Sequence, residues 1–279
     1  DDEAIQAWYE SATPSSRGRP QRYSDLAITT VLVIKRVFRL TLRAAQGFID
    51  SIFTLMNVPL RCPDYTSVSK RAKSVNVSFK TFTRGEIAHL VIDSTGLKVF
   101  GEGEWKVRKH GKERRRIWRK LHLAVDSNTH EVVCADLSLN NVTDSEAFPG
   151  LIRQTHRKIR AAAADGAYDT RLCHDELRRK KISALIPPRK GAGYWPGEYA
   201  DRNRAVANQR MTGSNARWKW TTDYNRRSIA ETAMYRVKQL FGGSLTLRDY
   251  DGQVAEAMAL VRALNKMTKA GMPESVRIA

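Results

Sequence analysis

Three carboxylates in this sequence stand where they could act together on a phosphate group. Asp93 follows the apolar run LVI and precedes the turn-like tripeptide STG, and Asp165 follows the run AAAA and precedes Gly166. Glu231 lies in YNRRSIAETAMYRVKQLFGG (224–243), whose apolar residues recur at helical spacing. Carboxylate oxygens are ligands that Mg²⁺ prefers, and three carboxylates can hold two divalent cations about 4 Å apart for an in-line phosphoryl displacement.

The two aspartates are informative only as a pair. A single Asp at the end of a strand usually caps a turn with its side chain, so each has an ordinary structural explanation. If the two strands are parallel neighbours, their carboxyl ends meet at one edge of the sheet, where crevices in open sheets lie. We therefore expect Asp93 and Asp165 to share that edge.

The predicted helix at 224–241 carries its polar residues on one side. Tyr224, Arg227, Glu231 and Lys238 fall on a stripe about 60° wide, opposite an apolar face. The ordinary explanation is a solvated stripe in which Arg227 and Glu231 form an i,i+4 ion pair. If Glu231 joins the two aspartates, Arg227 and Lys238 can bind phosphates and Tyr224 can donate a hydrogen bond to one.

The charge of the chain favours a polyanionic partner. Lys and Arg number 48 against 29 Asp and Glu, which gives a net charge of +19 and a pI near 10.1. Nucleic acid is the usual partner of such a field, with an anionic membrane surface or a ribosomal neighbour as alternatives. The basic stretch 106–120 is either a solvated loop or a surface that binds the phosphates of DNA without sequence preference. The basic residues expected to contact DNA there are Lys106, Arg108, Lys109, Arg114, Arg115, Arg116, Arg119 and Lys120.

Cysteine usage and hydropathy indicate the compartment. The three cysteines are widely spaced and form no CxxC pair, which favours a reducing compartment over a disulfide framework or a zinc ribbon. No apolar run near the N-terminus is long enough to span a bilayer, and no signal-peptide pattern is present. We therefore expect a cytoplasmic protein.

The order of predicted elements indicates an α/β fold. Residues 86–187 read as three consecutive strands followed by helix, strand, helix and strand, a succession that the ribonuclease-H-like fold uses. We expect a mixed five-stranded sheet flanked by helices over 86–187 and 223–279, with an insertion at 188–222. Residues 1–22 read as a polar arm or linker.

Residues 23–80 read as three helices, with Ser24 as the N-cap of the first and Lys70 and Arg71 on the short third one. This pattern fits a helix-turn-helix-like DNA-binding domain or, equally well, a helical cap on the main domain.

Taken together, these blocks resemble a known family. Tyr224-x2-Arg227-x3-Glu231-x6-Lys238 is similar to the Y-(2)-R-(3)-E-(6)-K signature of bacterial insertion-sequence DDE transposases. LVIDSTGLKVFGEGEW and ADGAYD resemble the family's blocks around its first and second acids. The resemblance implies a ribonuclease-H-like core in which Asp93, Asp165 and Glu231 bind two Mg²⁺ or Mn²⁺.

The resemblance also implies an activity and its partners. The enzyme would cleave DNA at the terminal inverted repeats of a mobile element and transfer the freed 3′-hydroxyl ends into target DNA. It would act as a homo-oligomer on paired ends, on the nucleoid of a bacterial cell. Two other functions stay open: a repurposed DNA-binding protein without catalysis, and a ribonuclease-H-like nuclease without strand transfer.

The predicted insertion has a possible use of its own. Its length makes the spacing between the second and third acids larger than in the compact family core. In related enzymes, a tryptophan of such an insertion stacks on a base flipped out of a DNA hairpin. Trp195, Trp218 and Trp220 are the candidates, and packing of these rings onto the core is the alternative.

Overall fold

The computed structural model of this chain describes residues 2–10, 22–79, 81, 83–99 and 117–271. The chain divides into two compact units, which are described here one at a time. The helical unit comprises Asp1–Phe79, Lys98–Ile117 and Val237–Leu264, and the sheet unit comprises Lys80–Leu97, Trp118–Arg236 and Asn265–Ala279.

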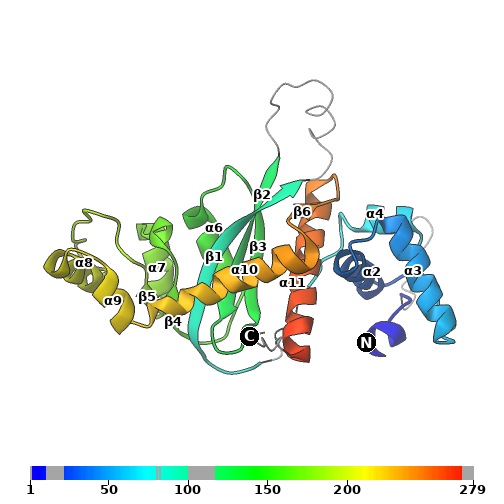
Figure 1. The fold of residues 1–279 in the computed structure, drawn as a ribbon, viewed down its shortest axis with the longest axis horizontal. Helices are drawn as coiled ribbons and strands as arrows, with labels where there is room; N and C mark the ends of the chain where they lie inside the picture. Colours follow the sequence, from blue (N-terminus) through cyan, green and yellow to red (C-terminus); the bar gives the residue numbers. More distant parts are fainter. Residues whose placement is uncertain (1, 11–21, 80, 82, 100–116, 272–279) are drawn as a thin grey trace, which may run out of the picture. The chain divides into compact units, whose positions relative to one another are not determined.

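Figure 1 shows the helices and strands of the chain. The strands follow one another in the order that the sequence predicts. The strands are β1 (Ile87–Val99), β2 (Trp118–Asp126), β3 (Val132–Leu139), β4 (Ile159–Ala163), β5 (Ser183–Leu185) and β6 (Ser244–Leu245). The helices are α1 (Asp2–Gln6), α2 (Asp25–Val37), α3 (Leu42–Leu55), α4 (Tyr65–Arg71), α6 (Asp144–Arg153), α7 (Arg171–Arg179), α8 (Ala200–Thr212), α9 (Ala216–Thr221), α10 (Ser228–Phe241) and α11 (Tyr250–Ala270), with the 3₁₀ turns η1 (Gly166–Tyr168) and η2 (Tyr224–Arg227).

The strands form one mixed sheet in the order β3-β2-β1-β4-β5, with β6 paired to the end of β1. β2 and β3 are antiparallel, whereas β4 is parallel to both β1 and β5. Helices connect the parallel strands, as parallel pairs require. The prediction of a ribonuclease-H-like α/β fold with a mixed, helix-flanked sheet is therefore confirmed.

α6 and α7 cover one face of this sheet. Alternate residues of β1, among them Leu90 and Ile92, point into the core on that face, where they meet Phe148 of α6 and Leu177 of α7. Val91, between these two residues, and Asp93, directly after Ile92, therefore point to the opposite face, because side chains alternate along a strand. This alternation places Asp93 away from the α6–α7 core.

β1 differs from its prediction at one point. The sequence STG after Asp93 predicts a turn, yet β1 continues through Ser94, Thr95 and Gly96 to Val99. Gly96 has another role, because a Cβ atom there would lie 3.2 Å from the ring of Trp118. The glycine thus allows the β2 tryptophan to pack on β1, and Asp93 lies inside a strand rather than at its end.

The helical unit contains the three helices expected over 23–80. Ser24 caps α2, since its hydroxyl accepts a hydrogen bond from the Ala27 amide at 3.1 Å. The residues before α2 are also packed: α1 begins the chain, and Trp8 is buried edge-on against Phe53 with its indole N–H donating to the Arg61 carbonyl. The described part of 1–22 is thus not a free linker, because Trp8 anchors it in the core of this unit.

The end of α2 is buried by an ion cluster. Lys35 and Arg36 both pair with Glu256 of α11, at 2.6 and 3.0 Å, and all three side chains are buried. Arg36 also donates to the carbonyl of Phe241, at the end of α10. These contacts, all within the helical unit, hold α2 against the end of α10 and against α11.

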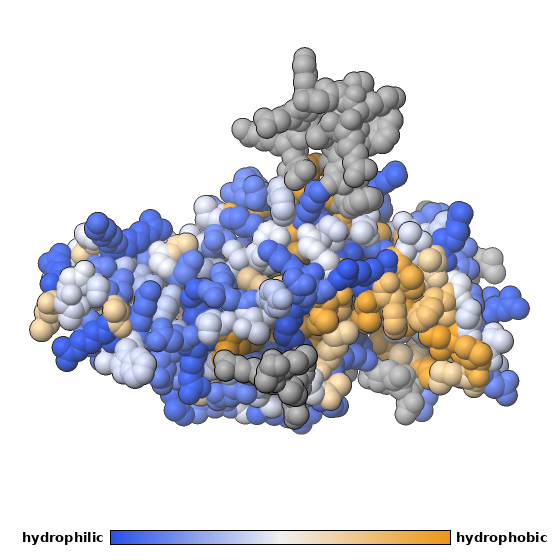
Figure 2. Space-filling view, in the orientation of Figure 1, coloured by the Kyte–Doolittle hydropathy of each residue, from blue (hydrophilic) through white to orange (hydrophobic). Residues whose placement is uncertain are grey.

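The surfaces of the two units differ in character (Figure 2). The helical unit shows the largest orange area of the visible face, and Phe38, Leu55 and Met56 are among its exposed side chains. The sheet unit is mainly hydrophilic in the same view. None of the helices in the described ranges combines the length and the hydropathy that a bilayer-spanning segment needs.

Candidate active site

The parallel pairing of β1 and β4 brings two of the predicted acids to one level. The last pair in register joins Val91 to Ala163, and Asp93 and Asp165 each stand two residues beyond it. There β4 ends while β1 continues, so the two carboxylates flank the opening between the strands. The two acids thus lie at the same level of neighbouring parallel strands, as expected, although only Asp165 stands at the end of its strand.

Asp165 is held by the turn that follows β4. It is the N-cap of η1, and its Oδ1 accepts a hydrogen bond from the Ala167 amide at 2.8 Å. This is the capping role that Asp commonly plays at strand ends. The cap also orients the carboxylate, so the ordinary explanation and the functional one apply to the same side chain.

Arg227 connects the third acid to the first. Its Nη1 donates to Asp93 Oδ2 at 3.1 Å, and its Nη2 forms an ion pair with Glu231 Oε1. The i,i+4 pair expected from the sequence is thus present, and the same guanidinium reaches across to the sheet. Glu231, on the first turn of α10, is thereby placed on the face of β1 to which Asp93 points.

The site is electrostatically unusual around Asp93. Burial raises the pKa of Asp93, and the negative charges of Asp165 and Glu231 raise it further, while the Ser94 amide and Arg227 oppose the shift. Burial disfavours the charged form of Arg227, yet Tyr224, Asp93 and Glu231 hold its pKa above the ordinary value. A cation between the acids thus offsets their repulsion.

The three acids do not meet at one point. Among the described residues, no three acidic, histidine or cysteine side chains lie close enough together to hold a metal ion as they stand. The physical reason is Arg227, whose guanidinium lies between Asp93 and Glu231 and pairs with both.

The helix that carries Glu231 begins later than predicted. Residues 224–227 form the 3₁₀ turn η2, and α10 starts at Ser228. Tyr224 is only 6% exposed and packs on Trp218, and burial raises its pKa to about 12. Tyr224 is thus a buried residue rather than part of an exposed stripe, and its contact with DNA stays a prediction. Lys238, about two turns beyond Glu231 on α10, is exposed as expected.

The basic residues predicted to bind DNA fall into three groups. Lys106, Arg108, Lys109, Arg114, Arg115 and Arg116 lie outside the described residues, and Lys70 is exposed on α4. Arg119 donates to the Trp118 carbonyl, and Lys120 donates to the Val142 carbonyl and lies 3.5 Å from Asp144. Arg71 donates to the Tyr23 carbonyl and pairs with Asp25. Lys120 and Arg71 thus have partners inside the fold, and DNA binding by these residues stays a prediction.

The three tryptophans of the insertion lie in different environments. Trp218 is 6% exposed and belongs to the core, which disagrees with a base-stacking role. Trp195 is half-buried, and the guanidinium of Arg202 covers its ring at 3.6 Å. Trp220 is 78% exposed on α9 and has a free ring. Of the three candidates, Trp220 thus has the most exposed ring, and its base-stacking role stays a prediction.

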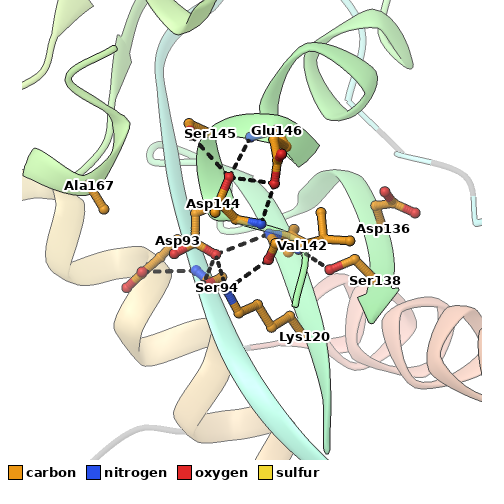
Figure 3. Close-up of polar contacts among 12 residues, drawn as sticks. Asp93, Ser94, Lys120, Asp136, Ser138, Val142, Asp144, Ser145, Glu146 and Ala167 are labelled. Atoms are coloured by element: carbon orange, nitrogen blue, oxygen red, sulfur yellow. Dashed lines mark hydrogen bonds and ion pairs between the residues drawn. The ribbon is translucent and has the colours of Figure 1, made fainter. Parts of the chain in front are cut away.

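Sequence reasoning missed three residues beside the site. Ser94 donates from its amide to Asp93 Oδ1 and from its hydroxyl to Asp144 Oδ1, each at 2.9 Å (Figure 3). Tyr168 is 1% exposed, and its hydroxyl has no hydrogen-bond partner within the described ranges. The sequence could have indicated Tyr168, because this residue stands only three positions after Asp165. Asp144 gave no such indication, because it lies in a TDSE block that predicts the start of a helix.

Comparisons with known proteins place the chain in a family. Two family models, each described as a transposase DDE domain, match residues 84–266 and 1–102. Among solved structures, the chain is similar to a piggyBac transposase synaptic complex with hairpin DNA, at 11% identity and a TM-score of 0.36 over 98% of this chain and 72% of that one. A pre-cleavage Mos1 transpososome matches at 11% identity and a TM-score of 0.26, over 95% and 84% of the two chains. Because the first family model covers most of the residues, and includes all three acids, the chain belongs to the DDE transposase family.

Proposed function

We propose that this chain cleaves DNA at the ends of a bacterial mobile element and joins the freed 3′-hydroxyl to target DNA, with Asp93, Asp165 and Glu231 as ligands of two divalent cations. The observation that carries the proposal is the equal register of Asp93 and Asp165 on parallel strands, with Glu231 joined to Asp93 through Arg227. Two divalent cations bound there would activate the attacking oxygen and stabilise the leaving one.

The donors present fit hard cations such as Mg²⁺ or Mn²⁺. All three acids offer carboxylate oxygens, and DDE transposases generally use divalent ions. The buried Tyr168 hydroxyl supports the fit, since a buried hydroxyl without a partner costs about 1–3 kcal/mol unless a ligand or a water supplies one. Arg227 occupies part of the space between the acids, so it must turn away when they hold a cation.

Arg227 then has a second role. Released from Asp93 and Glu231, its guanidinium can bind a phosphate oxygen with two parallel hydrogen bonds. Exposed Lys238 on the same helix supplies a further positive charge, and the net charge of +19 favours DNA along the surface. Tyr224, packed on Trp218, supports the turn from which Arg227 extends.

The test uses the full chain and a duplex that carries the inverted repeats flanking its gene. With Mg²⁺, we expect strand cleavage at the repeat end and a joined product when target DNA is added, both detected on denaturing gels. Binding without nicking would favour the repurposed DNA-binding protein, and nicking without joining would favour a nuclease. Light scattering of the complex would show whether more than one chain assembles on paired ends.

Replacement of two tryptophans should separate structure from DNA binding. Trp218→Ala should lower the free energy of unfolding by about 3–5 kcal/mol, because the ring is buried. Trp220→Ala should change it by less than about 0.5 kcal/mol, because the ring is exposed. If Trp220 stacks on a base, its loss should weaken binding of hairpin DNA by about 1–3 kcal/mol, measured by fluorescence anisotropy. Unchanged DNA affinity of a folded Trp220→Ala protein would exclude that role.

A further inference from the structure

A polar network lies behind Asp93, on the opposite face of β1 (Figure 3). Ser94 is its centre: the amide donates to Asp93 Oδ1 and the hydroxyl donates to Asp144 Oδ1, both at 2.9 Å. Because consecutive side chains of a strand point to opposite faces, Ser94 faces α6 while Asp93 faces α10. One residue thus joins a carboxylate on the α6 side to the carboxylate of the site.

Asp144 is itself held from several directions. Lys120 Nζ lies 3.5 Å from Asp144 Oδ1 and also donates to the Val142 carbonyl at 2.9 Å. His122 Nδ1 lies 3.8 Å away, with its Nε2 paired to the Ser138 hydroxyl at 2.8 Å. Burial lowers the pKa of His122, although Asp144 opposes the shift. These contacts, from β2 and from the turn before α6, restrict the Asp144 carboxylate to one position.

Capping of α6 does not account for this position. Thr143 is the N-cap of α6, and it forms a full capping box with Glu146: each side chain bonds the other residue's amide. The first turn of the helix is therefore satisfied without Asp144. What Asp144 does accept is the hydroxyl of Ser94, fifty residues earlier in the chain.

The phenol of Tyr168 indicates that the network adjoins the site. Its ring is buried against Phe148, and its hydroxyl has no partner among the described residues. Burial raises its pKa, and the negative charges of Asp144, Asp93 and Asp165 are among those that raise it further. The carboxylate on the α6 side and the two strand acids therefore act electrostatically on the same buried hydroxyl.

We propose that Asp144 is a positioning residue for the reaction: through Ser94 it fixes the Asp93 carboxylate in the orientation that cation binding requires. The inference rests on the proposed function of Asp93. The bond from the Ser94 hydroxyl to Asp144 restrains Ser94 from the α6 side, and the amide of the same residue donates to Asp93. Groups that orient a metal ligand from behind typically contribute about 10- to 100-fold to metal affinity or activity.

The test measures Mn²⁺ binding to the full chain by isothermal titration calorimetry, alongside Mn²⁺-dependent cleavage of repeat-end DNA. Asp144→Ala and Ser94→Ala should each weaken Mn²⁺ binding about tenfold, and the double variant should be no weaker than either alone. Asp144→Asn should restore most of the affinity, because its amide oxygen can still accept the Ser94 hydroxyl. The melting temperature without metal shows that each variant is folded.

Asp136 provides the matched control. It is also a half-buried strand acid that accepts the next residue's amide at 2.9 Å, yet it has no bond to Ser94, so Asp136→Ala should bind Mn²⁺ like the wild type. Wild-type affinity in Asp144→Ala, about 100-fold loss in the double variant, or no recovery in Asp144→Asn would each overturn the inference. Should Asp144→Ala not fold, Ser94→Ala with wild-type affinity would overturn it as well. Asp93→Asn tests the proposed function separately. If that variant binds Mn²⁺ with wild-type affinity, Asp93 is not a ligand of the cation and the proposed metal site is wrong.

Discussion

Replacing Asp93 with asparagine is expected to reduce the rate of strand cleavage by about 10³-fold while the protein stays folded. Asparagine keeps the shape of the side chain but removes the charge that a divalent cation requires. Since burial raises the pKa of Asp93, loss of its negative charge should destabilise the fold little, and Arg227 retains Glu231 as a partner. The measurement is the single-turnover cleavage rate on repeat-end DNA at saturating Mg²⁺.

Asp165→Asn and Glu231→Gln should show losses of the same order, because the proposed site needs all three acids. Asp136→Asn is the control, since it removes a half-buried strand acid remote from Arg227 and should leave the rate unchanged. Wild-type rates in all three site variants, each with a normal melting temperature, would disprove the assignment. If the variants still cleave DNA but no longer join the 3′-hydroxyl to target DNA, the acids would instead be assigned to strand transfer.

Replacing Glu256 with glutamine is expected to lower the free energy of unfolding by about 3–5 kcal/mol, because it leaves two buried cations without their counter-charge. Glu256 is 0% exposed and accepts from Lys35, Arg36, the Thr246 hydroxyl and two backbone amides. The measurement is urea denaturation of the full chain, followed by circular dichroism. Asp249→Asn, which breaks the exposed Lys73–Asp249 pair, should have no measurable effect.

The same carboxyl predicts a dependence of stability on pH. Burial would raise the pKa of Glu256, but Lys35 and Arg36 outweigh burial and hold it below the ordinary value of 4.5. A lowered carboxyl pKa adds stability above the unfolded value, and this stability is lost as the pH falls through the folded pKa. The wild type should therefore lose stability below about pH 4.5 more steeply than Glu256→Gln. Parallel pH profiles of the two proteins would show that the cluster contributes little.

Much of the fold could be predicted because its signals are local. The run LVID and the run AAAAD read as buried strands, and Ser24 read as a helix cap, since each depends on a few neighbouring residues. The stripe on α10 followed from helical periodicity in the same way. The Arg227–Glu231 pair is likewise a short-range contact, because residues four apart on a helix are neighbours.

Local signals also misled where a distant contact decided the structure. STG reads as a turn, yet β1 continues because β6 pairs with its end and Trp118 packs over Gly96. Tyr224 reads as a surface residue of the stripe, yet the insertion supplies Trp218, on which it packs. β6 and Trp118 lie far along the chain from STG, and Trp218 lies before the helix whose periodicity predicted the stripe, so in neither case does the local pattern carry information about the partner.

By itself, the sequence determined the three acids, the cationic residues near Glu231 and the strand order, because spacing and alternation are properties of a local segment. Only the tertiary structure decided that Arg227 lies between Asp93 and Glu231, that Asp144 of α6 accepts the hydroxyl of Ser94, and that the Tyr168 hydroxyl is buried without a partner among the described residues. The physical reason is that strand register and helix packing, set by the whole core, bring side chains together that are far apart in the sequence.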